Sequence, residues 1–478
     1  MKKNKFYLTA AIPYVNARPH IGHVLEFVQG DVLARHNRKI GNDVFYITGG
    51  DENSLKNVRA AEEEGTPVDE FCKRNSEYFR KVAEDFNVLL DNFQRSSLPN
   101  HIESSQDLWR RCAEAGDIYK KRYEGLYCVG CESFYTPDEL NNGECLEHPG
   151  KKLELVEEEN YFFKLSNYTD QLKKLIATDE YAVSPESKKN ETLGFIEKGL
   201  EDFSISRSNE RAHGWGVSVP GDDSQKMYVW FDALNVYRSA APEWWPAEAH
   251  LIGKGILRFH SIYWPAILLS AKLPLPKKLL VHGYITINGQ KMSKSIGNVI
   301  DPSSLIPKYG ADAIRYYLLK EIPSFGDGDF SESKMQAVYN SDLANGLGNY
   351  ASRVLTLGSK EELSSKFELD SDVSARISKA KAEVGEKIEA FKLNEALFSI
   401  WSLISFGDEY INKKEVWKIA DPKEKNLALF NLTQILVEVT DMLEAFLPQT
   451  SAKIKQYIEV TPDSYKLTKP SPLFPRIQ

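Results

Sequence analysis

The chain has 478 residues, of which 42% are hydrophobic, which is enough for a packed core and for more than one domain. Its 60 basic and 68 acidic side chains give a net charge of −8, which excludes a general attraction to nucleic acid, so an RNA or DNA partner would need a local basic surface. The sequence lacks the roughly 20-residue apolar run of a membrane-spanning helix and the apolar stretch of a secretory signal, and five cysteines are too few for a disulfide scaffold, so we expect a soluble, cytoplasmic protein.

The first 60 residues alternate in the manner of a βαβ unit. Residues 6–12 form an apolar, β-prone run, residues 20–38 carry apolar side chains at helical spacing, and residues 43–48 form a second β-prone run before two glycines. This pattern predicts a Rossmann-like, doubly wound parallel α/β sheet.

A histidine motif, His20-Ile21-Gly22-His23, stands where the first predicted strand gives way to its helix. A helix start offers free N–H groups and partial positive charge, glycine lets a ligand approach the backbone, and two imidazoles one turn apart can donate to phosphate oxygens. The motif therefore suits the phosphates of a nucleotide. Taken alone it is weak, because two histidines at this spacing also suit a metal ion or a plain surface.

Residues 116–202 differ in composition from both flanks and predict a small domain inserted into the sheet. Within it, Cys128 and Cys131 are followed after 13 residues by Cys145 and His148, which is the paired-knuckle spacing of four tetrahedral zinc ligands. Three thiolates and an imidazole leave no open coordination position, so the pattern predicts one structural Zn²⁺ per chain. The two remaining cysteines, Cys72 and Cys112, are expected to be buried apolar residues.

Strand and helix alternate again over residues 251–257, 259–270 and 279–287, so the sheet is expected to resume after the insertion. A lysine loop follows, with Lys291 and Lys294 between Gly289 and Gly297. Two lysines in a glycine-bordered loop can neutralise the charge of a departing pyrophosphate, although a solvated basic loop is the ordinary alternative. Beyond it, apolar residues at helical spacing over 373–391 and 432–446 predict an all-helical domain.

The histidine motif and the lysine loop together, in this order and context, resemble the signature motifs of class I aminoacyl-tRNA synthetases. Over nearly its whole length the chain is similar to the methionyl-tRNA synthetases, in the form with one zinc knuckle. The matching stretches are Ala11–Asn16, Thr48–Asn53, Asp202–Arg207, Tyr228–Ala233, Arg258–Ala266 and His282–Tyr284.

The resemblance implies a ligase that activates L-methionine with ATP to methionyl-adenylate and transfers the methionyl group to the 3′-terminal adenosine of methionine tRNA. It implies catalysis by His20, His23, Lys291 and Lys294. These residues, together with Gly22, Gly253 and Lys254, would bind ATP, with Mg²⁺ on the phosphates. The domains that it implies are a Rossmann catalytic domain in two halves (1–115 and 203–290), a connective insertion with the zinc knuckle (116–202), the lysine loop and its linker (291–335) and a helical anticodon-binding domain (336–478).

For the amino acid, the resemblance implies that Asp51 holds the α-ammonium. The side-chain pocket would consist of Ile12, Tyr14, Trp230, Ala233, Leu234, Tyr237, Ile256 and His260. It further implies that Asn349, Arg353 and Trp417 contact the anticodon, as an amide, a guanidinium and an indole can. The residues alone favour the ordinary alternatives, which are a core for the pocket positions and Trp417 and a helix surface for Asn349 and Arg353.

The sequence shows three departures from the family pattern: Gly255 replaces an aspartate, Val416 replaces a proline, and Asn53-Ser54 replaces a frequent His-Gly pair. Two other functions fit parts of the sequence. A nucleotidyltransferase without RNA would not need the helical tail, and a zinc-knuckle nucleic-acid-binding protein would not need the lysine loop. The chain ends soon after the tail, without the module by which some relatives dimerise, so we expect a monomer.

Overall fold

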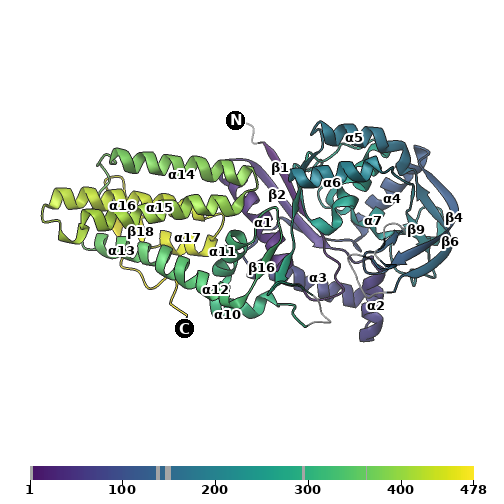
Figure 1. Cartoon of the computed structure of the whole chain (residues 1–478), viewed down its shortest axis with the longest axis horizontal. Helices are drawn as coiled ribbons and strands as arrows, with labels where there is room; N and C mark the ends of the chain where they lie inside the picture. Colours follow the sequence, from purple (N-terminus) through teal and green to yellow (C-terminus); the bar gives the residue numbers. More distant parts are fainter. Residues whose placement is uncertain are drawn as a thin grey trace. The chain divides into compact units, whose positions relative to one another are not determined.

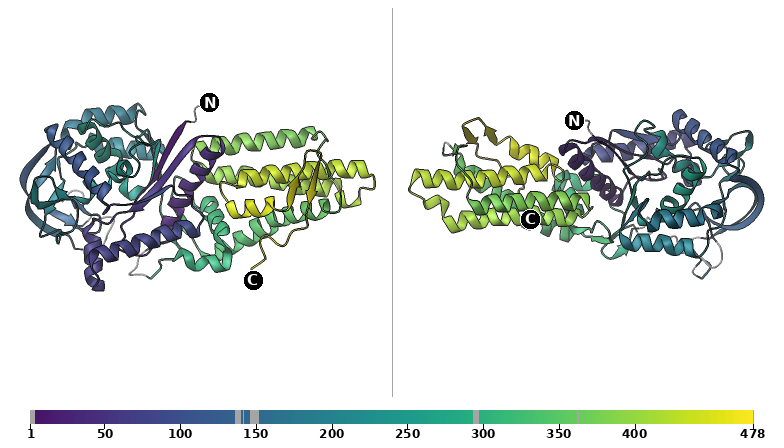
Figure 2. Two further views of the ribbon diagram at one scale, coloured as in Figure 1. Left: turned by 180° about the vertical axis from the view of Figure 1, so that it is seen from behind. Right: turned by 90° about the horizontal axis from the view of Figure 1, so that it is seen from above.

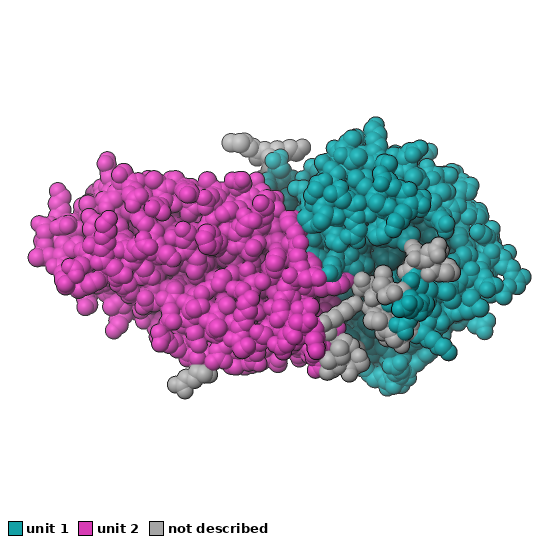
Figure 3. Space-filling view, viewed as in Figure 1, with its two compact units in different colours: residues 1–19, 41–84, 89–282 teal, residues 20–40, 85–88, 283–478 magenta. Residues whose placement is uncertain are grey.

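The computed structural model of the chain describes residues 4–135, 140, 142–145, 152–292, 297–361 and 363–477. The chain divides into two compact units, coloured separately in Figure 3. Unit 1 comprises residues 1–19, 41–84 and 89–282, and unit 2 comprises residues 20–40, 85–88 and 283–478. Among the described residues, no helix combines the length and the apolar character needed to cross a membrane.

Unit 1 is built on a six-stranded sheet in which every neighbouring pair is parallel. Its order is β3 (Asn92–Arg95), β2 (Asp43–Gly50), β1 (Lys5–Ala10), β12 (Ala249–Gly253), β13 (Lys278–His282) and β7 (Ala182–Ser184). Since β1 pairs with β2 on one side and with β12 on the other, the order reverses beside β1, which is where parallel sheets bind ligands. The prediction of a doubly wound sheet interrupted by an insertion is confirmed.

Helices lie between the strands of this sheet along the chain, as connections between parallel strands require. They are α2 (Leu55–Glu64), α3 (Val68–Asp85), α4 (Pro99–Glu114), α5 (Thr169–Ala177), α6 (Glu186–Glu197), α7 (Val229–Ala233), α8 (Val236–Ser239) and α9 (Trp264–Ser270). The helix predicted over 259–270 begins as a π-helical turn, η4 (Phe259–Tyr263), after a 3₁₀ turn, η3 (Lys254–Ile256). Pro265 has no N–H for an α-helical bond, which explains why the regular helix starts beside it.

Three strands of the insertion, β4 (Ile118–Cys128), β5 (Ser133–Tyr135) and β6 (Glu154–Phe163), form an antiparallel sheet with β8 (Phe203–Ser204), which follows the insertion. Strands β4 and β6 are the curved strands of Figure 1. A second small sheet contains β9 (Ser206–Ser208), β10 (Ser218–Val219) and β11 (Asp222–Met227). Strand β7 lies within the predicted insertion but pairs with β13 at the edge of the parallel sheet. A run of three residues is too short for the sequence to predict this pairing.

Unit 2 is mainly helical (Figures 1 and 2). Its helices are α1 (Ile21–Lys39), α10 (Ile306–Tyr309), α11 (Ala311–Glu321), α12 (Glu332–Val338), the π-helical η6 (Tyr339–Gly348), α13 (Asn349–Gly358), α14 (Ser371–Glu389), α15 (Leu393–Lys414), α16 (Pro422–Leu443) and α17 (Pro448–Lys455). The helical C-terminal region is confirmed. It also contains a small sheet that helical spacing did not predict, β17 (Leu363–Ser364), β19 (Ser464–Leu467) and β18 (Ile458–Val460).

A buried arginine ties α1 to the later helices of unit 2. The Arg315 guanidinium lies 2.8 Å from the Asp31 carboxylate, and neither side chain is exposed. It also donates to the carbonyl oxygens of Phe86, Ala445 and Phe446 at 2.8–3.0 Å. Because removing one partner would strand a buried charge, this cluster fixes the helix that begins at the histidine motif.

Candidate active site

The histidine motif caps helix α1. The Gly22 N–H donates to Nδ1 of His20 at 3.1 Å, and the His20 N–H donates to Nδ1 of His23 at 3.0 Å. The two rings stack with centroids 3.8 Å apart. Since each Nδ1 accepts a bond, the proton of each neutral ring lies on Nε2, where it can be donated to a phosphate oxygen. Burial and the neighbouring His20 hold the pKa of His23 well below its ordinary value, so this ring is neutral at pH 7.

The segment around the lysine loop lies beside the histidine motif within unit 2. The Ile21 N–H donates to the Ile300 carbonyl at 3.3 Å, and a Cβ at Gly22 would stand 3.3 Å from Cε of Met292. Any side chain at position 22 would therefore crowd the loop as well as the His20 ring. Two segments some 270 residues apart in the sequence are thus neighbours. Lys294 and the Lys291 side chain lie outside the described residues, so their roles stay predictions.

Aromatic residues predicted to form the amino-acid pocket contact one another in unit 1. The Trp230 ring lies edge-on to Tyr14 and to His260, each at 6.3 Å between centroids, and the Tyr237 ring lies 5.7 Å from His260. Trp230, Ala233, Leu234 and Tyr237 are buried in one apolar cluster, against which Ile12, Tyr14 and Ile256 pack half-buried. The Tyr14 hydroxyl is buried and has no hydrogen-bond partner among the described residues. A polar group of a bound ligand could satisfy it.

His260 is held in one neutral form. Its Nδ1 lies 3.0 Å from the Ile256 carbonyl, which can only accept, and its Nε2 lies 2.8 Å from the Tyr237 hydroxyl. The proton therefore sits on Nδ1, and Nε2 accepts from the tyrosine. Burial lowers the pKa of His260 to about 4, although the bond to Ile256 opposes the shift. Both ring nitrogens have hydrogen-bond partners, so the neutral imidazole adds a polarisable, uncharged surface to the cluster.

Asp51 follows β2, where its backbone bridges to Tyr14. Its side chain is buried and accepts from the Asn53 N–H at 3.2 Å. Burial, then the charges of Asp232 and Glu132, raise the pKa of Asp51 well above its ordinary value. A bound ammonium group would offset all three effects, so this carboxylate is suited to a cationic ligand.

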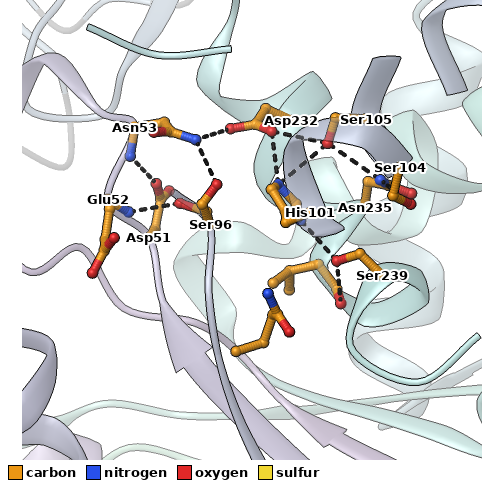
Figure 4. A network of polar contacts seen from close by, with 12 residues as sticks. Asp51, Glu52, Asn53, Ser96, His101, Ser104, Ser105, Asp232, Asn235 and Ser239 are labelled. Atoms are coloured by element: carbon orange, nitrogen blue, oxygen red, sulfur yellow. Dashed lines mark hydrogen bonds and ion pairs between the residues drawn. The ribbon is translucent and has the colours of Figure 1, made fainter. Parts of the chain in front are cut away.

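A polar network that the sequence did not reveal connects Asp51 to helix α7 (Figure 4). The Asn53 side-chain amide donates to Asp232 at 2.6 Å and to the Ser96 carbonyl at 3.1 Å. The other oxygen of Asp232 lies 2.7 Å from Nε2 of His101 and accepts from Ser105 at 3.0 Å. Asp232 and His101 are both buried. Asn53, which replaces the family's usual histidine, thus joins the segment after β2, which contains Asp51, to helix α7, which contains Trp230.

Gly253 ends β12 and Lys254 begins η3, at the carboxyl edge of the sheet, where a nucleotide is expected. Gly255 follows in the same turn and is exposed. Glycine has no carboxylate, so this position cannot make the side-chain contact to ATP that an aspartate in the family pattern would make.

Comparisons with known proteins agree with this geometry. The family model described as "tRNA synthetases class I (M)" matches residues 6–148 and 131–355. The methionine–tRNA ligase of Brucella suis is 37% identical over 510 aligned positions, covering 100% of this chain and 98% of that protein. That of Thermotoga maritima is 40% identical, covering 94% of this chain and 74% of that protein. The chain belongs to the methionyl-tRNA synthetase family.

Solved structures of methionyl-tRNA synthetases have the same fold. The Mycobacterium tuberculosis methionyl-tRNA synthetase in complex with methionyl-adenylate has a TM-score of 0.94 at 33% identity, covering 99% of this chain and 100% of that one. The apo form of the M. tuberculosis synthetase has a TM-score of 0.86 at 31% identity, covering 100% and 99%. The likeness therefore extends over both compact units.

Three of the four predicted zinc ligands of this methionyl-tRNA synthetase family member lie together. The sulfur atoms of Cys128, Cys131 and Cys145 are within 4.8 Å of one another, and Cys131 and Cys145 are 3.3 Å apart. Three sulfur atoms around tetrahedral Zn²⁺ would be about 3.8 Å apart, given Zn–S bonds of about 2.3 Å, so the cluster fits a zinc ion. His148 lies outside the described residues. Cys72 and Cys112 are buried away from this cluster, as predicted.

The first half of the knuckle contacts the apolar cluster that contains Trp230. Glu132, next to Cys131, is fully buried and accepts from the Arg207 guanidinium at 3.0 Å and from the Lys56 N–H at 3.1 Å. The Trp230 indole donates to the Cys131 carbonyl at 3.4 Å. A metal that fixes Cys131 would therefore also fix Trp230, which is predicted to line the amino-acid pocket.

The predicted anticodon residues all lie in unit 2. Asn349 begins α13 and is exposed, and Trp417, in a 3₁₀ turn after α15, is 49% exposed. Arg353 donates to Asp408 at 2.9 Å and to Asn412 at 2.7 Å, both on α15. Arg353 therefore binds the C-terminal part of α15, and Trp417 lies just after that helix. Contact of either residue with an anticodon stays a prediction.

Proposed function

We propose that the chain activates L-methionine with ATP and transfers the methionyl group to the 3′-terminal adenosine of methionine tRNA. The observation that carries the proposal is the match to methionine–tRNA ligases over the whole chain, up to 98% of the relative's length. The site agrees with it, because a buried acid, an indole and a neutral imidazole surround the expected place of an amino acid with an apolar, unbranched side chain.

In the first step, a carboxylate oxygen of methionine attacks the α-phosphorus of ATP, a new P–O bond forms, and the bond to pyrophosphate breaks. The methionine carboxylate is already ionised at neutral pH, so no general base is needed. Catalysis therefore rests on positioning and on stabilising phosphate charge. The Nε2–H groups of His20 and His23, with the start of α1, would donate to the phosphates.

The lysine loop would complete the charge stabilisation. Lys291 and Lys294 would bind the β- and γ-phosphates as pyrophosphate leaves, while Gly253 and Lys254 contact the nucleotide at the carboxyl edge of the sheet. Mg²⁺ bound to ATP would neutralise part of the phosphate charge.

For the amino acid, the Asp51 carboxylate would pair with the α-ammonium. The side chain would lie against Ile12, Tyr14, Trp230, Ala233, Leu234, Tyr237, Ile256 and His260. A thioether packs well against aromatic rings, which favours methionine over shorter apolar amino acids. In the second step, a hydroxyl of the terminal adenosine, the 2′-hydroxyl by analogy with class I enzymes, attacks the carbonyl carbon of the adenylate, and AMP leaves.

The zinc site is structural in this proposal. Cys128, Cys131 and Cys145, with His148 as the fourth ligand, would hold one Zn²⁺ per chain, and four protein ligands would leave no position for a substrate. The enzyme would act as a cytoplasmic monomer.

Charging of methionine tRNA tests the proposal. We expect the purified protein to attach methionine to a methionine tRNA transcript in the presence of ATP, and to charge a transcript with an altered anticodon poorly. Trp417→Ala should raise the KM for tRNA by about tenfold, as the loss of one stacked base would, and leave methionine activation unchanged. Equal charging of both transcripts would contradict tRNA selection by the helical region.

A further inference from the structure

A buried histidine outside the predicted amino-acid pocket connects three helices of unit 1 (Figure 4). His101, on α4, is fully buried. Its Nε2 lies 2.7 Å from the Asp232 carboxylate on α7, and its Nδ1 lies 2.7 Å from the Ser239 hydroxyl on α8. Because a carboxylate can only accept, Nε2 carries a proton and donates it to Asp232.

A serine, a histidine and an aspartate in contact can form a nucleophilic triad, but this serine is unsuited to that role. Ser239 is only 5% exposed, and its hydroxyl lies 3.2 Å from the Val236 carbonyl of the same helix, to which it can donate. A nucleophile must instead reach a substrate. The contacts of His101 therefore indicate a link between helices rather than a second catalytic centre.

Two consecutive hydrogen bonds lead from Asp232 to the carboxylate that is predicted to hold the α-ammonium of the amino acid. The Asn53 side-chain amide donates to Asp232 at 2.6 Å, and the Asn53 N–H donates to the Asp51 carboxylate at 3.2 Å. The amide also donates to the Ser96 carbonyl at 3.1 Å, so both of its hydrogens are used and its orientation is fixed. A movement of Asp232 would therefore shift the N–H that orients Asp51.

Asp232 depends on donors from α4, because it is buried close to a second carboxylate. It is 1% exposed, and burial, followed by the nearby charge of Asp232, raises the pKa of Asp51. A buried carboxylate requires strong hydrogen-bond donors. His101 supplies one, and the Ser105 hydroxyl supplies another at 3.0 Å. Since both donors belong to α4, this helix determines where the Asp232 carboxylate lies.

We infer that His101 and Ser105 are positioning residues for the α-ammonium of the amino acid, and that they act on Asp51 through Asp232 and Asn53. The inference rests on the proposed function, in which Asp51 binds that ammonium. The ammonium is bound both before and during the attack on ATP, so a misplaced Asp51 should weaken methionine binding and leave the chemical step unchanged.

Methionine-dependent ATP–pyrophosphate exchange measures the effect at His101. We expect His101→Leu to raise the KM for methionine by about tenfold, with kcat and the KM for ATP unchanged. His101→Gln should restore the normal KM, because its amide nitrogen is as many bonds from Cβ as Nε2 is and can donate to Asp232. A lower kcat with an unchanged KM in His101→Leu would overturn the inference, because loss of folded protein reduces the number of active sites and not their affinity.

Two buried serines of unit 1 provide a matched pair of milder variants. Ser105→Ala should raise the KM for methionine by about fivefold, because Asp232 loses one of its donors. Ser270→Ala is the control, since the Ser270 hydroxyl donates to a different buried aspartate, Asp117, at 2.8 Å. It loses an equivalent bond and should keep the normal KM. Equal effects of the two variants on the KM would contradict the inference.

Combination with Asp51→Asn tests the route of the effect. Asp51→Asn alone removes the carboxylate that His101 is inferred to position, so adding His101→Leu should not lower kcat/KM for methionine further. A further tenfold loss would show that His101 acts through another part of the pocket and would overturn the inference. Failure of the proposed function would appear instead as no methionine-dependent exchange in the unaltered enzyme.

Discussion

At the scale of single residues, Asp51 carries an electrostatic cost that a ligand would relieve. Its pKa is raised by burial and by the neighbouring carboxylates of Asp232 and Glu132. A carboxyl group whose pKa is higher in the folded than in the unfolded protein destabilises the fold at every pH above its unfolded pKa. At pH 7, the ligand-free protein is therefore less stable than a variant with a neutral side chain at position 51.

Asp51→Asn should accordingly raise the melting temperature of the ligand-free protein at pH 7. It should also lower kcat/KM for methionine in pyrophosphate exchange by at least about 100-fold, because a buried ammonium would lose its partner. Asp43→Asn, on the exposed start of the same strand, is the control. A variant that melts lower and still activates methionine normally would exclude the assigned role.

His260 provides a pH-dependent prediction. Its pKa is lowered by burial to about 4, against about 6.5 in an unfolded chain. Between these values the unfolded protein binds more protons, so the free energy of unfolding falls as the pH falls. The contribution of this one ring to the loss is roughly 2 kcal/mol between pH 7 and pH 5.

In His260→Gln, the loss of unfolding free energy between pH 7 and pH 5 should therefore be smaller by roughly 2 kcal/mol, as measured by denaturant titration. The exposed His213 is a suitable comparison, and His213→Gln should keep the full acid sensitivity. If His260→Gln lost stability as steeply as the unaltered protein, the ring would titrate normally in the fold.

At the scale of elements, the cysteine cluster that could hold zinc is joined to Arg207 through Glu132 and to Trp230 through the Cys131 carbonyl, and Trp230 is predicted to line the amino-acid pocket. Freshly purified, reduced protein should contain one zinc ion per chain. Removal by a chelator should lower the melting temperature of unit 1 and decrease pyrophosphate exchange, because structural zinc contributes directly to folding. Cys145→Ser should reproduce both effects. Metal-free protein with full exchange activity would show that the cysteine cluster does not support the site.

The elements also show which features the sequence predicts well. Long periodic segments such as α1, α14 and α16 were predicted because one face of each is apolar, and the interrupted sheet was predicted because β-prone runs and helices alternate on both sides of the insertion. The edge strand β7 was missed because pairing with β13 is a tertiary contact, and three residues carry no pattern of their own.

The candidate site likewise contains some residues that the sequence predicts and others that it does not. His20, His23 and the cysteines carry short motifs with fixed spacing, whereas His101 and Asp232 meet across 131 positions of the sequence and have no local signature. In the sequence, Asn53 stands out only as a departure from the family pattern. Its bond to Asp232 explains how an amide can join these elements without a charge of its own.

At the scale of the whole molecule, each compact unit combines segments that are far apart in the sequence. Helix α1 belongs to the unit that contains the segment around the lysine loop and the C-terminal helices, although β1, directly before it, belongs to the parallel sheet. The bond from the Ile21 N–H to the Ile300 carbonyl therefore lies within one compact unit. Within the same unit, the buried Arg315 and Asp31 pair ties α1 to the later helices.

Pyrophosphate exchange into ATP, measured with each of the twenty amino acids in turn, tests the central claim most directly. Only methionine should drive rapid exchange in the zinc-loaded protein, without tRNA, because the acid at Asp51 and the apolar, aromatic cluster beside it suit a thioether amino acid. Exchange driven best by a different amino acid, or by none, would contradict the assignment.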